Sequence, residues 1–435
     1  MTWLQRYRLS RYFRGSLWIL PAIGMATALV AIRVLHAIET LVGWESGFDP
    51  STAQTLLGTL AASMFTLIVF ACSALLISVQ LASAQLTPRL IGLVLQSRTT
   101  NHAVALFVFT FTFTLGALLR IKGAVPLLTA YVAVCSCLAS LLVFFYLVER
   151  LCYVLRPSGA LGWAARLGRE AITQVYPRRL SECSGTTPEP APSQTGAPRC
   201  TIHNRREGVV LAFDMNGLVT LAQRADCLIE MVPQVGDFVA ADQPLFRVFG
   251  QGALPAESAL YHSVAVGPER TMQQDPAFAF RIMVDIASKG LSPAINDPTT
   301  AVLAIDQIQY LLRHVGSRRL DEGRVRDPQG SVRLLYRTPD WEDFVALAVT
   351  EIRHFGGTSI QIARRLRAML QDLVQTLPED RAAILRMESK LLDRSAKRFF
   401  VEEEDQAMAD VSDFQGVGGR QTMNDKHPDA NRPGA

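Results

Sequence analysis

The sequence is short of charge. Asp, Glu, Lys and Arg make up 19% of its 435 residues, whereas soluble domains average about 25%. The shortage is concentrated, because residues 15–155 hold ten charged side chains, about 7% of that stretch. The net charge of +4 is too small to indicate a polyanionic partner. These deficits argue against an ordinary soluble enzyme, a disordered chain and a nucleic-acid-binding protein.

The sequence also lacks the residue patterns of metal and catalytic sites. It has seven cysteines, an odd number, with no CxxC pair, which excludes a disulfide scaffold and offers no zinc site. It contains no GxGxxG, Walker, HExxH or GxSxG sequence. Lysine is scarce relative to arginine, which suits lipid headgroups and carboxylate pairs better than Schiff-base chemistry. We therefore predict no cofactor, no metal, no catalytic residue and no enzymatic activity.

Within the charge-poor region lie four apolar stretches. Each is long enough to cross a bilayer core of about 30 Å as a helix, and the first has no clear signal-peptide cleavage site. The sequence therefore predicts an α-helical membrane domain over residues 1–155, in contact with the lipid bilayer, with spans at about 16–40, 56–86, 103–120 and 124–150.

Arginine and lysine near these spans set the expected orientation. With both termini inside, ten cationic residues lie on the inner side and two on the outer side. The reverse topology would invert those numbers, against the positive-inside rule. We therefore expect a multi-pass membrane protein, with its N-terminus and its C-terminal region in the cytoplasm.

The remaining chain predicts a cytoplasmic α+β region. A juxtamembrane segment and Pro-rich linker occupy 156–200, followed at 201–255 by a small β-barrel-like module that resembles the hammerhead of biotinyl and lipoyl domains. That module contains no lysine to carry a cofactor. A helical bundle is expected over 256–400, interrupted by a short hairpin or loop at 326–337, and a disordered acidic tail over 401–435.

Two helices of the expected bundle carry the same signals at their ends. Asp275-Pro276 and Asp297-Pro298 each place an N-cap carboxylate before a first-turn proline. Gly290 and Gly316 then end the two helices.

One polar cluster in this pair of helices is a candidate ligand site. Arg281 and Asp285 are four residues apart and share a helix face, and the tight turn that follows can return Asn296 and Asp297 toward them. One interpretation is a site that binds an anion or another small ligand, and the other is a capped helical hairpin with an internal ion pair. The candidate residues are Arg270, Arg281, Asp285, Asn296 and Asp297.

A second candidate is a polar stripe along the second span. Hydroxyl and amide side chains recur there every seven residues, with one serine beside them, and so share one helix face. Such a stripe can line a pore or can let helices pack closely, and both interpretations stay open. The stripe comprises Thr59, Ser63, Thr66, Ser73 and Gln80.

Two segments carry a resemblance to a known family. They are VQLASAQLTPRLI at 79–91 and GPERTMQQDPAFAFRIMVDIASKGLSPAINDPTTAVLAID at 267–306, of which SPAINDPTTA is the most specific part. On these residues the chain resembles the bacterial predicted-membrane-protein family catalogued as domain of unknown function number 2254, from the first span to about Phe400. The resemblance implies a membrane location and this architecture, and it supplies no activity.

The function expected from the sequence together with this resemblance is a non-enzymatic integral protein of the bacterial inner membrane, a homo-oligomeric, channel-like or permeation protein with a cytoplasmic regulatory domain. Four spans are few for a complete transporter, and assembly of several copies commonly completes a pore. The alternative is a membrane-anchored sensor or scaffold that binds a small ligand or a protein on its cytoplasmic face.

Overall fold

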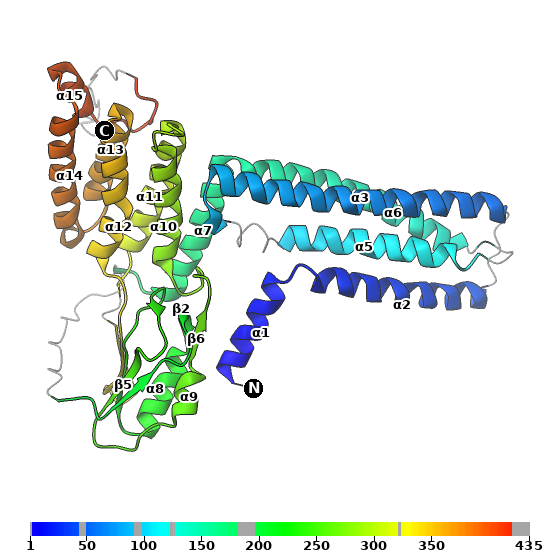
Figure 1. Cartoon of the computed structure of the whole chain (residues 1–435), viewed down its shortest axis with the longest axis horizontal. Coiled ribbons are helices and arrows are strands. Elements are labelled where there is room, and N and C mark those ends of the chain that lie inside the picture. The colour runs from blue at the N-terminus through cyan, green and yellow to red at the C-terminus, as the bar shows by residue number, and fades with distance from the viewer. Residues whose placement is uncertain are drawn as a thin grey trace, which may run out of the picture.

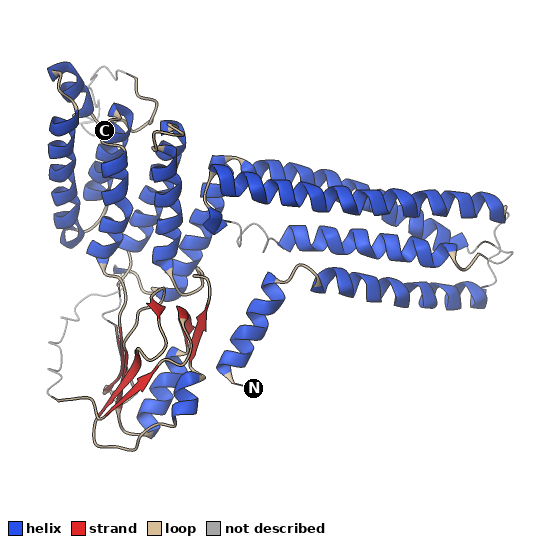
Figure 2. Cartoon of the chain, in the orientation of Figure 1, coloured by secondary structure: helices blue, strands red, loops and turns tan. Residues whose placement is uncertain are grey.

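The computed structural model describes residues 2–42, 49–90, 98–121, 125, 127–180, 196–320 and 323–419. Long helices run side by side at one end of the molecule, and a second helical bundle lies beside a β-sheet module at the other end (Figure 1). The strands lie together, apart from both groups of helices (Figure 2).

Four helices in the described residues are long and apolar enough to cross a membrane, which confirms the predicted multi-span domain. They are α2 (Ile19–Val42), α3 (Pro50–Gln85), α5 (Arg98–Leu118) and α6 (Leu127–Leu155). Of these, α5 packs against each of the other three. The N-terminal helix α1 (Trp3–Gly15) precedes them and contacts the β module instead.

The interior of the four-span bundle is apolar and closely packed. Phe107 and Phe113 of α5 are fully buried. Gly24 of α2 lies so close to α5 that an added Cβ would stand 2.6 Å from the carbonyl oxygen of Ala105. The carboxylate of Glu39 accepts hydrogen bonds from the backbone N–H and the hydroxyl of Thr129, in the first turn of α6, at 2.8 and 2.9 Å. This capping ties the ends of two spans together.

The second bundle begins with the predicted juxtamembrane helix. α7 (Pro157–Val175) follows α6 and packs on α10 and α11, and part of the expected Pro-rich linker, 181–195, lies outside the described residues. The other helices of the bundle are α10 (Pro276–Gly290), α11 (Pro298–Gly316), α12 (Trp341–Phe355), α13 (Ile360–Thr376), α14 (Glu379–Phe399) and α15 (Glu403–Ala409).

The helix ends follow the predicted signals. The side chain of Asp275 accepts a hydrogen bond from Phe278 N, and that of Asp297 accepts one from Thr300 N. Proline occupies the first turn of both helices, and the two helices end at Gly290 and Gly316. The local sequence thus determines where α10 and α11 begin and end.

The β module contains two open sheets. One has the strand order β1-β5-β3-β8-β7 and the other β4-β2-β6. The barrel-like closure expected from the sequence is not confirmed. The strands are β1 (Cys200–His203), β2 (Gly208–Phe213), β3 (Leu228–Met231), β4 (Phe238–Val239), β5 (Pro244–Phe249), β6 (Val264–Gly267), β7 (Arg324–Arg326) and β8 (Val332–Tyr336), and the module adds α8 (Met215–Arg224) and α9 (Glu257–Tyr261).

Two parts of the chain differ from the predicted organisation. The strand β6 comes from the range expected to be helical, and β8 pairs in parallel with β3, so that the module is assembled from separate segments. The hairpin expected at 326–337 is present as the antiparallel pair of β7 and β8. Within the segment expected to be disordered, Glu403–Ala409 form α15, and Arg364 binds the backbone carbonyl of Val411 at 3.1 Å. The residues from 420 onward lie outside the described range.

Candidate functional site

The end of α3 meets the second helical bundle. With 36 residues, α3 is about 54 Å long at 1.5 Å per residue, well beyond a bilayer core of about 30 Å. Its last turn reaches α10. There the Nζ of Lys289 donates a hydrogen bond to the carbonyl oxygen of Ser83 at 3.1 Å. The short helix η1 (Pro88–Leu90) follows α3 directly.

Four charged side chains join η1, α10 and α12 at this place, and we call them the junction network. Arg89 of η1 lies 2.7 Å from the carboxylate of Asp285 on α10. Arg281, one turn before Asp285, bonds the same carboxylate at 2.7 Å. Arg281 also binds both carboxylate oxygens of Glu351 on α12, at 2.6 and 2.8 Å. Arg281 thus connects α10 to α12, and Asp285 connects α10 to η1, which follows the membrane helix α3.

The junction network is electrically balanced. Two arginines face two carboxylates, and all three nitrogens of the Arg281 guanidinium donate to those carboxylates. The hydrogen bonds from Arg281 lower the pKa of Glu351, despite the opposing effect of burial, and they raise the pKa of Arg281. The arrangement therefore favours the charged forms of Arg281 and Glu351.

Arg270 lies at the start of α10. It forms an ion pair with the N-cap residue Asp275, with a second hydrogen bond of 3.0 Å. Its guanidinium carbon is 5.5 Å from the centre of the Phe278 ring, and that of Arg89 is 6.0 Å from the same ring. Burial raises the pKa of Asp275, and Arg270 opposes that rise. Arg270 also packs against Gly236 of the β module, so it links the module to the bundle.

Asn296 and Asp297 lie beyond the other end of α10. Asn296 has a left-handed backbone with φ of 48°, and the backbone N of Asp297 donates to the carbonyl of Gly290 at 2.7 Å. The Asp297 carboxylate caps α11 through Thr300. Both residues therefore shape the turn between α10 and α11.

Of the five candidate ligand residues, the structure thus joins Arg281 to Asp285. It places Arg270 at one end of α10, and Asn296 with Asp297 at the other. It adds Arg89 and Glu351, which the sequence analysis did not include. The position of Arg89 directly after the second span, behind Thr87-Pro88, was the available signal that it lies where that span ends.

The stripe on α3 points away from the bundle of its own chain. All five of its side chains are exposed. The hydroxyls of Thr59, Ser63 and Thr66 donate to backbone carbonyls one turn earlier, at 2.8, 2.8 and 3.1 Å. The stripe therefore takes no part in packing between the helices of one chain, and it faces lipid or another molecule.

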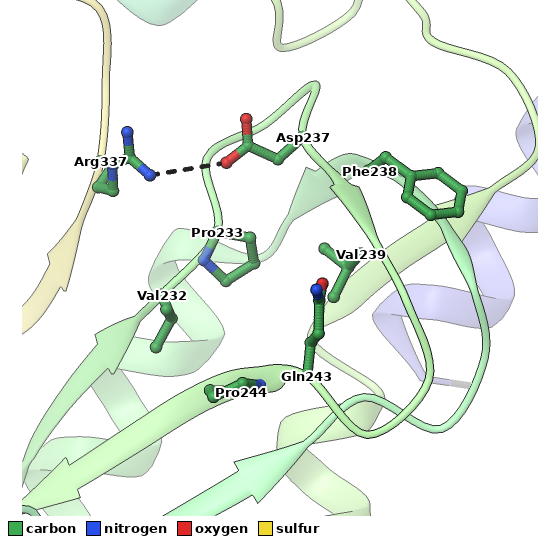
Figure 3. Close-up of a pocket in the computed structure, with 8 residues that line it drawn as sticks. All are labelled: Val232, Pro233, Asp237, Phe238, Val239, Gln243, Pro244 and Arg337. Atoms are coloured by element: carbon green, nitrogen blue, oxygen red, sulfur yellow. Dashed lines mark ion pairs between the residues drawn. The ribbon is translucent and has the colours of Figure 1, made fainter.

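A small pocket lies at one side of the β module. Its volume is about 350 Å³, and Arg337, after β8, lies 3.8 Å from the carboxylate of Asp237 at its mouth (Figure 3). Phe238 and Pro244 contribute apolar surface to its wall. The chemistry is that of a shallow, mixed-polarity cleft.

Comparison with known proteins agrees with this architecture. The profile of a family described as predicted membrane protein, DUF2254, matches residues 14–372. The chain belongs to this family. The resemblance seen in the sequence is therefore confirmed.

This family member also has curated relatives. An uncharacterised protein of Mycobacterium bovis and one of Mycobacterium tuberculosis are each 27% identical to it over 417 residues, covering 91% of this chain and 79% of theirs. No solved structure matches the chain. Since α14 and α15 come after residue 372, they lie beyond the part that the family profile matches.

Proposed function

We propose that this protein is a non-enzymatic, homo-oligomeric, channel-like protein of the bacterial inner membrane. In this proposal α3 lines the permeation path, and the β module with the second helical bundle forms a cytoplasmic regulatory region. The observation that carries the proposal is the outward-facing stripe on α3, because a row of hydroxyls exposed along a membrane helix needs a polar environment or close-packed neighbours.

A permeation path between several copies of the chain agrees better with the packing of the spans than a path through a single copy. The interior of the four-span bundle is filled by Phe107 and Phe113. The buried hydroxyls there are also satisfied locally: Thr110 bonds Ser140 at 2.9 Å, and Thr114 donates to the carbonyl of Thr110 at 2.8 Å. A route through a single chain would have to displace these side chains, whereas assembly around α3 would not.

The chemistry of the stripe suits hydrated solutes. From Thr59 to Gln80 the sequence contains no Asp, Glu, Lys, Arg or His, so this stretch carries no acid–base pair for a proton relay. Phe70 lies between Thr66 and Ser73 on the same side of the helix, four residues after one and three before the other, and it is exposed. An aromatic ring in that place can form an apolar constriction that closes by dewetting.

The soluble region is positioned to control such a path. Lys289 and Asp285 of α10 hold the end of α3 and η1. A shift of α10 within the cytoplasmic bundle would therefore move the end of the pore-lining helix directly. This connection supports a regulatory role for the soluble region.

Cross-linking tests the assembly. In a cysteine-free variant reconstituted in liposomes, Ser63→Cys should form disulfide-linked pairs of chains. The matched control is Leu142→Cys, which is also an exposed position but lies on α6, and it should not form them. A chain that stays monomeric in the membrane, with no cross-link at Ser63, would remove the proposal.

Current recordings test the path. Purified protein in planar bilayers with KCl should give discrete conductance steps, and Thr66→Val should lower the conductance because it removes a hydroxyl while keeping the volume. Leu142→Val on α6 should leave the conductance unchanged. Absence of current under varied voltage and membrane tension would contradict the permeation function.

A second candidate function is a membrane-anchored sensor or scaffold. The observation that favours it is the pocket between Asp237 and Arg337, which is large enough for a small ligand. A thermal-shift screen with small carboxylates and phosphate would test it, and a compound that stabilises the unaltered protein but not Arg337→Ala would favour this function over the first.

A further inference from the structure

The N-terminal helix α1 has two different faces. On one face, Leu4 is buried against Leu211 and Ala265 of the β module. Trp3 and Tyr7 stack with ring centres 5.2 Å apart and pack on the same cluster. The capping box between Thr2 and Gln5 fixes the start of the helix. One side of α1 is therefore attached to the β module.

The opposite face of α1 is apolar, and the residues that the structure describes leave it exposed. Leu9, Tyr12 and Phe13 are three and four residues apart and so share a side, and they are 43%, 55% and 49% exposed. At 100° per residue, Arg6 and Arg8 fall on the two borders of this side, and both are exposed. A strip of large apolar side chains edged by arginines thus points away from the β module.

The position of α1 relative to the spans indicates what covers this strip. Only Ser16–Trp18 separate α1 from the membrane helix α2, and Leu17 and Trp18 are themselves exposed. In Figure 1 α1 runs across the direction of the four spans, between them and the β module. A helix that leaves a span at such an angle has the direction of a helix that lies along a membrane surface.

The charge of the segment fits the same surface. Residues 1–38 contain five arginines and no Asp or Glu. Amphipathic helices with arginines beside a Leu, Phe, Tyr and Trp face bind at the boundary of headgroups and acyl chains, and they bind anionic leaflets more tightly.

We propose that α1 is an interfacial helix that binds anionic lipid. Its Leu9–Tyr12–Phe13 strip enters the headgroup region of the leaflet that faces the soluble region, and Arg6 and Arg8 pair with lipid phosphates. Because the other face of α1 carries the β module, the lipid composition of that leaflet determines how firmly the module is held at the membrane. This inference is independent of whether α3 lines a pore.

Amide hydrogen exchange on the full-length protein in nanodiscs tests the proposal. Exchange across residues 3–15 should be at least tenfold slower in discs with 30% phosphatidylglycerol than in discs of phosphatidylcholine alone. Each arginine near an anionic surface contributes about a fivefold preference, so Arg6→Gln with Arg8→Gln should abolish most of the difference between the two lipids. The matched control, Arg394→Gln with Lys397→Gln, removes two exposed charges from α14 and should retain it.

Three results would overturn the proposal. One is equal exchange of α1 in the two kinds of disc. Another is amide exchange of α1 that becomes slower as the protein concentration rises in lipid-free detergent. That result would mean that a second copy of the chain, and not lipid, covers the strip. The third is an equal loss of the lipid effect in the α14 control, which would mean that total charge rather than α1 governs the response. The comparison of lipids uses the unaltered protein, so it stands even where a variant fails to fold.

Discussion

Replacing Arg281 by Gln should destabilise the second helical bundle, because Arg281 joins α10 to α12. The change removes three short hydrogen bonds to carboxylates and leaves Asp285 and Glu351 without the cation that lies between them. The Arg281 side chain is 27% exposed, so water recovers part of the loss. The free energy of unfolding should therefore fall by about 2 kcal/mol, which is typical for the loss of charge-assisted hydrogen bonds at partly buried sites.

The same reasoning gives a smaller effect for Arg89→Gln. Arg89 bonds one carboxylate and its side chain is 46% exposed, so the expected cost is about 0.5 kcal/mol. Since 1 kcal/mol shifts the melting temperature of a domain of this size by about 2–4 °C, the two variants should melt about 4–8 °C and 1–2 °C lower. Arg281→Lys should lie between them, because lysine keeps the charge but loses the two-pronged geometry.

Circular dichroism during heating of the purified protein in detergent measures these shifts, with Arg394→Gln on α14 as the control. The dependence of stability on pH provides a second test. The pKa of Glu351 is lowered in the folded protein from the ordinary glutamate value of 4.5. The stability that ionised Glu351 contributes is therefore complete above about pH 4.5 and is lost as the pH falls through the pKa of the folded state. A melting temperature for Arg281→Gln within 1 °C of the unaltered protein, or an equal loss for Arg89→Gln, would refute this account of the junction network.

Two further predictions concern other parts of the fold. Burial and the neighbouring Arg318 lower the pKa of His314 to about 4, so the stability it contributes is complete above about pH 6.5 and is lost as the pH falls toward 4. Unfolding measured at pH 7 and pH 5 should show a loss on the order of 1 kcal/mol, after allowance for partial exposure, that His314→Gln reduces; an equal loss in both proteins would contradict this. Gly24→Ala should destabilise the spans by about 1–3 kcal/mol through its overlap with Ala105, while Gly162→Ala, which meets no atom within 4 Å, should not. Thermal unfolding in detergent separates the two glycine variants, and equal melting temperatures would show that the contact between α2 and α5 yields without cost.

The sequence predicted those parts of the fold that depend on local patterns. The four spans follow from runs of apolar residues, and the ends of α10 and α11 follow from Asp-Pro and Gly signals. The pairing of Arg281 with Asp285 follows from their spacing along one helix. In each case the residues that decide the structure are neighbours in the chain.

Features that depend on distant segments could not be predicted in this way. Glu351 reaches Arg281 only because α12 packs on α10, and Arg89 reaches Asp285 across 196 positions of sequence. The short helix α8 lies within a stretch that reads as alternating strands, yet Leu218 and Ala222 are buried one turn apart on its inner side. The outward direction of the stripe on α3 likewise depends on which face the other spans cover.

The parallel pairing of β3 with β8 has a consequence for synthesis of the protein. Until Tyr336 has left the ribosome, β3 lacks the neighbour on one of its edges, and an unpaired edge invites pairing with another chain. All four spans and the linker precede it, so the module completes its sheet only after the membrane domain has been made. Truncation between residues 267 and 324 should therefore yield an aggregation-prone fragment, and the protein depends on folding its C-terminal region after its four spans have been made.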